Sequence, residues 1–207
     1  MATKTNIEAL RDTMAEAMRR DPSIIIVGED VGPRGGVFRA TQGLYDEFGP
    51  DRVIDSPLAE LSIIAVGIGL SLNGIRPICE IQFADFIHPA FNQIVNEAAR
   101  MRYRSNGQFH CPMVIRAPYG GGISGGLYHS QSIEAFFAHV PGLYVVAPST
   151  PYDITGLLRA ALRSPDPVLF LEHKKTYRLI KGEVPETDFI VPIGQADIKR
   201  PGNDLTV

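Results

Sequence analysis

Short apolar runs rich in β-branched residues alternate along this chain with segments of helical periodicity. The clearest run, at residues 23–27, is apolar after its first serine, as in a strand that is covered on both faces. Similar runs follow at residues 53–54, 77–83, 113–117, 143–147 and 168–171. Apolar strands that alternate with helices build right-handed βαβ units. The sequence therefore predicts an α/β fold with a parallel sheet flanked by helices.

The helical segments carry start and stop signals. Thr5 and Glu8 have the spacing of a capping box, and the helix that follows ends at Asp21. Further helices are predicted at residues 41–48, 58–72, 89–103, 132–138 and 152–163. The helix at 58–72 starts after Ser56-Pro57 and is apolar all round, so we expect it to be buried on every side. Its small residues 65, 67, 69 and 71 would let a neighbouring backbone approach closely.

Composition excludes several classes of protein. Twenty basic residues face 23 acidic ones in 207 residues, so the basic surplus of a nucleic-acid-binding protein is missing. Two cysteines, Cys79 and Cys111, cannot form a disulfide scaffold or a cysteine-rich zinc site. The longest apolar run, at residues 63–72, is far shorter than the roughly 20 residues that cross a bilayer. With no apolar signal core at the N-terminus, we expect a cytoplasmic protein.

Several motifs match catalytic patterns without their structural context. Residues 122–126 fit the G-x-S-x-G pattern of hydrolases, but the predicted strand ends near Ala117 and no helix starts before His129. Gly67 and Gly69 lie inside a helix and lack the third glycine of a dinucleotide fingerprint. The five histidines have no metal-ligand spacing. We therefore expect neither a hydrolase triad nor metal chemistry carried by this chain's side chains.

Glu60 is the first remaining candidate. It lies in the first turn of the apolar helix, between Leu58 and Leu61. An acidic residue there usually only complements the helix dipole. A carboxylate removed from water is costly unless it has a partner, so Glu60 is also a candidate ligand-binding group.

Two further segments follow predicted strands. Residues 80–86 carry polar and aromatic side chains at the carboxyl end of a strand, where open α/β sheets bind ligands, although ordinary loop chemistry is an equal alternative. Residues 128–132 place His129 between a glycine-rich loop and a helix start. A lone loop histidine is more often simply solvated, but beside a mobile loop it is well placed as an acid or base.

Five stretches resemble the beta subunit of the thiamine-diphosphate-dependent 2-oxo acid dehydrogenases: Gly-Glu-Asp-Val at 28–31, Asp-Ser-Pro-Leu-Ala-Glu at 55–60, residues 80–86, Tyr-Arg-Ser at 103–105 and residues 128–132. The resemblance runs from about residue 5 to residue 207. Ile-Gln-Phe-Ala-Asp at 81–85 and Glu-Ala-Phe-Phe-Ala-His at 134–139 are closer to the branched-chain (2-oxoisovalerate) type than to the pyruvate type. The resemblance implies a transketolase-like pyrimidine-binding domain at residues 1–185. Residues 186–207 would be a linker and the start of a C-terminal domain, so the chain looks truncated.

The resemblance also implies roles for particular residues. Glu60 would hydrogen-bond the aminopyrimidine ring of thiamine diphosphate and exchange a proton with it. Leu58 and Gln82 would line the pyrimidine. Phe86 matches an aromatic position that is often tyrosine, so stacking is kept and a hydroxyl is lost. His129 would assist acyl transfer onto a lipoyl group.

The remaining implications concern partners and ions. An alpha subunit would hold the diphosphate and its magnesium in a heterotetramer of two alpha and two beta subunits, and a lipoyl-bearing acyltransferase would receive the acyl group. Relatives can hold potassium on backbone oxygens, here near Met113, Val114 and the turn from Ser164 to Asp166. Ser164 stands where an acidic residue is usual.

The sequence thus leads to a functional hypothesis with two alternatives. The chain would supply half of an active site for oxidative decarboxylation of branched-chain 2-oxo acids and would work only with its alpha subunit. It could instead belong to a pyruvate or acetoin dehydrogenase. It could also be a non-catalytic assembly module in which the helix at 58–72 serves subunit packing.

Overall fold

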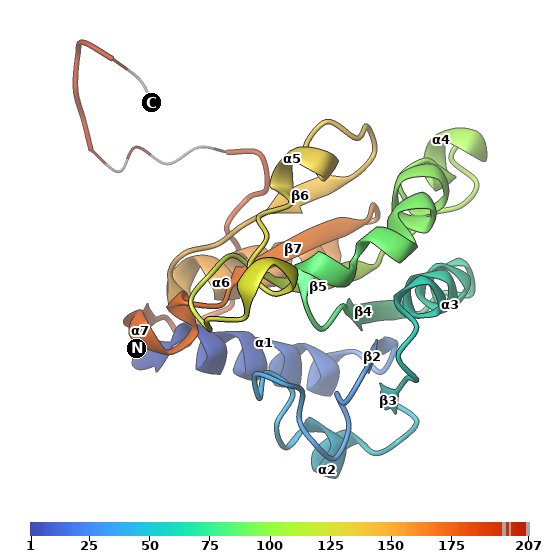
Figure 1. Cartoon of the computed structure of the whole chain (residues 1–207), viewed down its shortest axis with the longest axis horizontal. Coiled ribbons are helices and arrows are strands. Elements are labelled where there is room, and N and C mark those ends of the chain that lie inside the picture. The colour runs from blue at the N-terminus through green and yellow to red at the C-terminus, as the bar shows by residue number, and fades with distance from the viewer. Residues whose placement is uncertain (196–197, 199, 206–207) are drawn as a thin grey trace.

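A six-stranded parallel sheet forms the centre of the molecule (Figure 1). The computed structural model describes residues 1–195, 198 and 200–205. The strand order is β3–β2–β4–β5–β7–β6, and every neighbouring pair in it is parallel. The predicted α/β sheet is confirmed. The bounds are β2 Ile24–Gly28, β3 Val53–Asp55, β4 Arg76–Glu80, β5 Val114–Tyr119, β6 Tyr144–Val146 and β7 Val168–His173.

Helices connect these strands. The α-helices are α1 Asn6–Arg20, α2 Leu44–Phe48, α3 Glu60–Leu72, α4 Met101–Arg104, α5 Glu134–Phe137, α6 Pro151–Arg163 and α7 Thr176–Leu179. The predicted capping box is present at α1, where the Thr5 amide donates to the Glu8 carboxylate at 2.8 Å and the Thr5 hydroxyl accepts from the Glu8 amide. Among the described residues, no helix is long and apolar enough to span a membrane.

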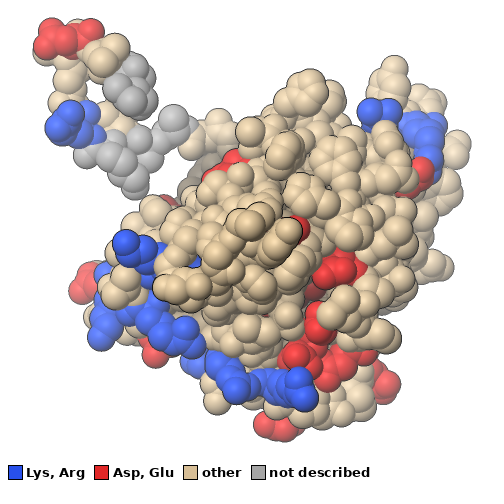
Figure 2. All heavy atoms as spheres, in the orientation of Figure 1, with Lys and Arg blue, Asp and Glu red and all other residues tan. Residues whose placement is uncertain are grey.

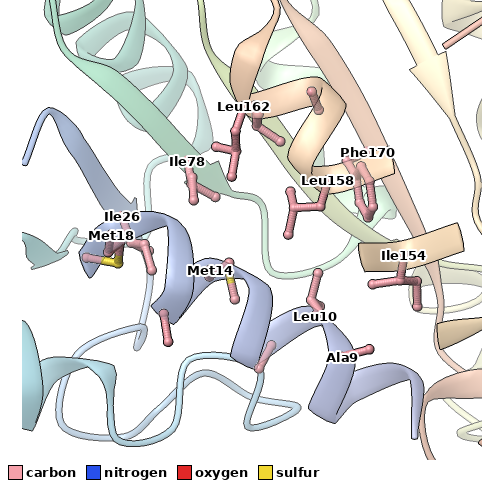
Figure 3. Packing of buried hydrophobic residues seen from close by; sticks show 14 of the residues in the cluster. Ala9, Leu10, Met14, Met18, Ile26, Ile78, Ile154, Leu158, Leu162 and Phe170 are labelled. Carbon is pink, nitrogen blue, oxygen red and sulfur yellow. The ribbon is translucent and has the colours of Figure 1, made fainter. Parts of the chain in front are cut away.

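Two apolar cores lie on opposite faces of the sheet because successive strand residues point to opposite sides. On one face α1 and α6 meet, and Figure 3 shows Leu10 and Met14 of α1 close to Leu158 of α6 and Phe170 of β7. The other core joins α3 and the segments after β4 to the alternate strand residues. Both faces of β2 are therefore covered, as its sequence predicts. Cys79 and Cys111 are buried as free thiols.

A second sheet of two antiparallel strands pairs β1 (Ala2–Thr5) with β8 (Lys181–Val184). It ties the N-terminus to the segment after α7, and local patterning does not predict it because the partners are far apart in sequence. The expected domain boundary at residue 185 stays a prediction. Asp204 and Leu205 form no strand. The strand opening expected at 204–207 also involves Thr206 and Val207, which lie outside the described residues.

The segment predicted as a single helix at residues 89–103 is helical over most of its length, but it is not one regular α-helix. The structure has two 3₁₀ turns, η1 (Ala84–Phe86) and η2 (His88–Ala90), then a π-helical segment, η3 (Gln93–Ala98), and α4. Where the π segment ends, Gly142 packs directly against Ala99: a Cβ on Gly142 would lie only 2.0 Å from the Ala99 carbonyl oxygen. That close backbone approach constrains a helix that periodicity alone shows as regular. A further 3₁₀ turn, η4 (Gly126–Tyr128), lies in the glycine-rich loop.

The predictions for the helix at 58–72 need two corrections. α3 begins at Glu60 with Ala59 as its N-cap, because the Ser56 hydroxyl donates to the Pro57 carbonyl at 2.7 Å and does not cap the helix. Burial on every side is also wrong for the described chain, since Leu61 is 45% and Val66 52% exposed. The sheet covers one face of α3 only, and an apolar sequence does not reveal how many neighbours a helix has.

The small residues of α3 have unequal roles. A Cβ on Gly67 would lie 2.4 Å from Cys79 Sγ and 2.9 Å from Met113 Cε, whereas a Cβ on Gly69 would meet nothing within 4 Å. The expected close approach of a neighbouring backbone is therefore wrong. Gly67 is approached closely by the side chains of Cys79 in β4 and of Met113 just before β5, and Gly69 by nothing within 4 Å.

This contrast gives a matched pair of variants. Gly67→Val should lower the free energy of unfolding by about 1–3 kcal/mol, because the added methyls overpack the contact with Cys79 and Met113. Gly69→Ala should raise it by up to about 1 kcal/mol, because alanine favours the helix and meets no neighbour. Urea denaturation of both variants measures the difference. Equal destabilisation by the two substitutions would contradict this account of α3.

Candidate active site

The candidate residues gather at the carboxyl edge of the parallel sheet. Glu29 follows β2, residues 81–86 follow β4, a glycine-rich loop at 120–126 follows β5 and Lys174 follows β7. Parallel strands all end at the same edge, so these segments meet although they are distant in sequence. Figure 2 shows acidic side chains gathered at the lower right of the molecule, where Figure 1 places β2, β3 and α2.

Glu60 occupies the first position of α3, where the helix N-terminus favours a negative charge. Its side chain is only 9% exposed and makes no hydrogen bond or ion pair with the described residues. The carboxylate of Glu29 lies close enough to feel that charge: burial raises the pKa of Glu29, and the carboxylates of Asp30 and Glu60 add to the effect. Glu60 therefore has its hydrogen-bonding capacity free in a mostly buried position.

His129 stands in an aromatic group formed by the segment after β4. Its ring centroid lies 4.6 Å from Phe83 and 5.4 Å from Phe86, both with edge-to-face geometry. Phe83 and Phe86 contact each other in the same manner at 5.8 Å. The structure thus brings together Phe86 and His129, which sequence reasoning selected separately, and adds Phe83, which contacts both.

Leu58 and Gln82 stand apart from this group. Leu58 is 73% exposed in the turn before α3, and Gln82 is half-buried just beyond β4. Neither side chain hydrogen-bonds to another described residue. Their expected role in lining a pyrimidine stays a prediction, and both remain accessible to a bound ring.

A buried charge cluster lies directly beneath the site. Arg116 of β5 is fully buried, donates to the Glu172 carboxylate at 2.6 and 2.7 Å, and also donates to Glu80. The Tyr177 hydroxyl donates to Glu172 at 2.5 Å. Burial raises the pKa of Glu80 while Arg116 opposes that rise. Sequence reasoning missed the cluster. The arginine inside the apolar run at 113–117 was a usable signal, because a charge in a buried strand needs partners.

The residues of the expected potassium site lie together where β5 and β7 begin. The carbonyl of Met113 accepts from the Val168 amide at 3.0 Å, the carbonyl of Ser164 accepts from Arg76 at 3.2 Å, and Asp166 pairs with Arg102 at 2.7 Å. Potassium would have to share or displace these partners, and its presence near Val114 stays a prediction. Among the described residues, no group of three or more His, Cys, Asp or Glu side chains could hold a metal ion.

A cavity of about 310 Å³ lies elsewhere, at the opposite edge of the sheet between the ends of α1 and α6. Its arginines include Arg159, which pairs with Glu16 at 2.7 Å, and Arg163, which pairs with Asp188 at 2.6 Å. Those two arginines already have ion-pair partners. The carboxylate of Glu60, which has no hydrogen-bond partner among the described residues, lies at the carboxyl edge of the sheet, so we place the candidate site there.

Comparison with known proteins identifies the domain. Residues 2–180 match the family model of the transketolase pyrimidine-binding domain. The chain belongs to this family. Its fold is shared with a transketolase from Leishmania mexicana, with a TM-score of 0.68 and 20% identity over 91% of this chain and 27% of that one. A split-gene transketolase, described as an inactive beta4 tetramer, aligns with a TM-score of 0.64 and 22% identity over 81% of this chain and 50% of that one.

Two sequence relatives are much more similar. The chain is 61% identical over its full length to the 2-oxoisovalerate dehydrogenase subunit beta of Bacillus subtilis, and 50% identical over its full length to a pyruvate dehydrogenase E1 component subunit beta of Acholeplasma laidlawii. It spans 63% of the length of each of these proteins. The predicted transketolase-like fold and the resemblance to the branched-chain type are both confirmed.

The buried cluster gives a stability test. Arg116→Met leaves Glu80 and Glu172 buried without their cation and should cost about 3–5 kcal/mol at neutral pH. Because burial raises the pKa of Glu80, the cost should shrink as the pH falls and Glu80 becomes neutral. Arg102→Met removes the exposed pair with Asp166 and should cost no more than about 1 kcal/mol. Denaturation curves of both variants across the acidic range compare them; equal losses would show that Arg116 is not needed to balance buried charge.

Proposed function

We propose that this chain supplies the pyrimidine half of a thiamine diphosphate site in the decarboxylating component of a branched-chain 2-oxo acid dehydrogenase complex. The observation that carries the proposal is Glu60, a mostly buried carboxylate without a partner among the described residues, at the helix start of a pyrimidine-binding domain. The 61% identity of the chain to a protein named 2-oxoisovalerate dehydrogenase subunit beta supports the branched-chain assignment.

Thiamine diphosphate, when bound, supplies the electron sink for decarboxylation. The task of this chain is to hold the pyrimidine and control a proton on it. Glu60 can donate to or accept from a ring nitrogen, since its carboxyl has no competing hydrogen bond in the described structure. Phe86 offers an aromatic ring for stacking, while Gln82 and Leu58 are accessible from the same edge of the sheet. These residue types fit a flat heterocycle with polar ring atoms.

His129 would act on the second substrate. It is half-buried at the end of the glycine-rich loop, and its ring packs in edge-to-face geometry with Phe83 and with Phe86. An imidazole can serve as a general acid or a general base. We assign to it the proton transfer that accompanies acyl transfer onto the lipoyl group.

The proposal requires other chains. An alpha subunit would hold the diphosphate and magnesium, in a heterotetramer of two alpha and two beta subunits, and a lipoyl-bearing acyltransferase would take the acyl group. The names of the relatives support a subunit role, since each is a beta subunit. The exposed apolar face of α3, with Leu61 and Val66, also suits a chain that works in an assembly.

Glu60 provides the direct test. In the full-length protein reconstituted with its alpha partner, Glu60→Gln and Glu60→Ala should lower the decarboxylation rate by about 10²–10⁴-fold, because both remove the group that exchanges the proton. Asp46→Asn, an exposed change on α2, is the matched control and should leave the rate unchanged. The chain without its alpha partner should be inactive. Undiminished turnover in both Glu60 variants would favour a non-catalytic assembly module.

A pyruvate dehydrogenase subunit is the second candidate, because the chain is 50% identical to one. Steady-state kcat/KM values for 2-oxoisovalerate and pyruvate separate the two. One methylene in an apolar pocket is worth about 10–200-fold, so a branched-chain enzyme should prefer the branched acid by at least about 10-fold. A preference for pyruvate of that size would replace the branched-chain assignment while leaving the role of Glu60 intact.

A further inference from the structure

Asp85 anchors the segment that carries His129. Its side chain, in η1, is 7% exposed, and Oδ1 accepts from the backbone amides of Ser130 and Gln131, both at 3.1 Å. Hydrogen bonds to an ionised acceptor are stronger than those between neutral groups. The carboxylate therefore holds the two amides that directly follow His129, from a different part of the chain.

Few other hydrogen bonds hold the loop, and one of them runs from the Gln131 side-chain amide to the Leu127 carbonyl at 3.1 Å. Positive φ angles occur at Gly120, Gly122, Ser124 and Gly126, so the approach to His129 consists largely of residues with wide backbone freedom. The His129 amide donates to the Gly126 carbonyl at 3.4 Å, a long contact, while the Gly120 amide donates to the Gln131 carbonyl at 2.9 Å. The Asp85 contacts thus fix the chain directly after His129.

Lys174 supplies the opposite charge from β7. Its side chain is only 4% exposed, Nζ lies 3.5 Å from the Pro118 carbonyl and 5.7 Å from the centroid of the Phe83 ring, and no carboxylate in the described chain pairs with it within 4 Å. Burial lowers the pKa of Lys174 and the carboxylate of Asp85 opposes that change, which places the two groups within electrostatic reach. Asp85 Oδ2 is itself buried without a hydrogen-bond partner in the described residues.

Both charged groups converge on His129. Asp85 acts through the backbone of Ser130 and Gln131, and Lys174 acts through Phe83, whose ring contacts both the ammonium and the imidazole. Burying a carboxylate and an ammonium without a direct ion pair is expensive, so a fold that keeps both gains little stability from them. We propose that Asp85 and Lys174 are positioning residues that hold His129 in its working orientation. The effect of these residues on catalysis by His129 rests on the proposed function, whereas their contacts with the loop are independent of it.

Hydrogen exchange tests the positioning without any assay of activity. In the full-length protein assembled with its alpha partner, Asp85→Asn should speed exchange of the Ser130 and Gln131 amides by at least about 10-fold, because the charged acceptor is lost. Lys174→Met should give a smaller increase. Because Asp85 and Lys174 hold the same segment, the two substitutions should not act independently. In the double variant, the increase in the amide exchange rate should be smaller than the product of the increases in the two single variants. Asp46→Asn and Lys181→Met, both exposed, are the matched controls and should change nothing.

Kinetics in the same assembly then tests the consequence. The rate of acyl transfer to the lipoyl domain should fall by about 10–100-fold in Asp85→Asn, while KM for the 2-oxo acid should stay unchanged. Displacing His129 would slow the transfer step without weakening the binding of the 2-oxo acid. Decarboxylation measured with a dye as electron acceptor should fall less than about 3-fold, as it should in His129→Ala.

The outcomes separate the two claims. Unchanged amide exchange in Asp85→Asn and Lys174→Met would overturn the positioning role, and so would independent, multiplicative effects in the double variant. Faster exchange with His129→Ala fully active would uphold the loop contacts while overturning the role of His129 in the proposed function. If Asp85→Asn fails to assemble, Lys174→Met alone decides, through the same exchange measurement.

Discussion

One guanidinium joins three strands at the point where the site begins. Arg116 on β5 reaches Glu80 on β4 and Glu172 on β7, with none of its side chain exposed. Charges of this kind cost several kcal/mol to desolvate and are tolerated only when every donor and acceptor is matched. The cluster therefore fixes the relative positions of strand ends, because a shift of one strand would leave a charge unpaired.

The site segments start from these same residues. Glu80 directly precedes residues 81–86, which carry Asp85 and Phe86, and Glu172 lies two positions before Lys174. Tyr177, bound to Glu172, also contacts Phe38, whose ring packs on Phe83 at 5.4 Å. The aromatic group around His129 is thus connected to the buried charges through side-chain contacts, and its geometry depends on strands that are held electrostatically.

Sequence patterns predicted the features of the fold and of the candidate site that depend on local periodicity and residue type. The parallel sheet, the capping box of α1 and the carboxylate at the start of α3 all follow from spacing and residue type, and resemblance selected Phe86 and His129. The β1–β8 pair, the π segment before α4 and the exposed face of α3 depend on contacts between distant segments, or on the absence of such contacts, and no local pattern encodes them. Asp85 lay inside the candidate segment 80–86 but was given no role of its own. Lys174 and Glu172 were missed because a charged residue near a strand end usually lies in solvent; Arg116, inside an apolar run, did carry a local signal.

The two principal site residues are held by different physical means. Glu60 belongs to a helix of 13 residues whose inner face packs on the sheet, so its backbone is rigid without help from other side chains. His129 follows glycines with positive φ and owes its position to a carboxylate and an aromatic group from another segment. In the proposed function Glu60 exchanges a proton with a ring that stays in place, and such an exchange needs a fixed partner. His129 would meet a lipoyl arm, and a group with that role can stand on a loop, provided that the loop is held in place beside it.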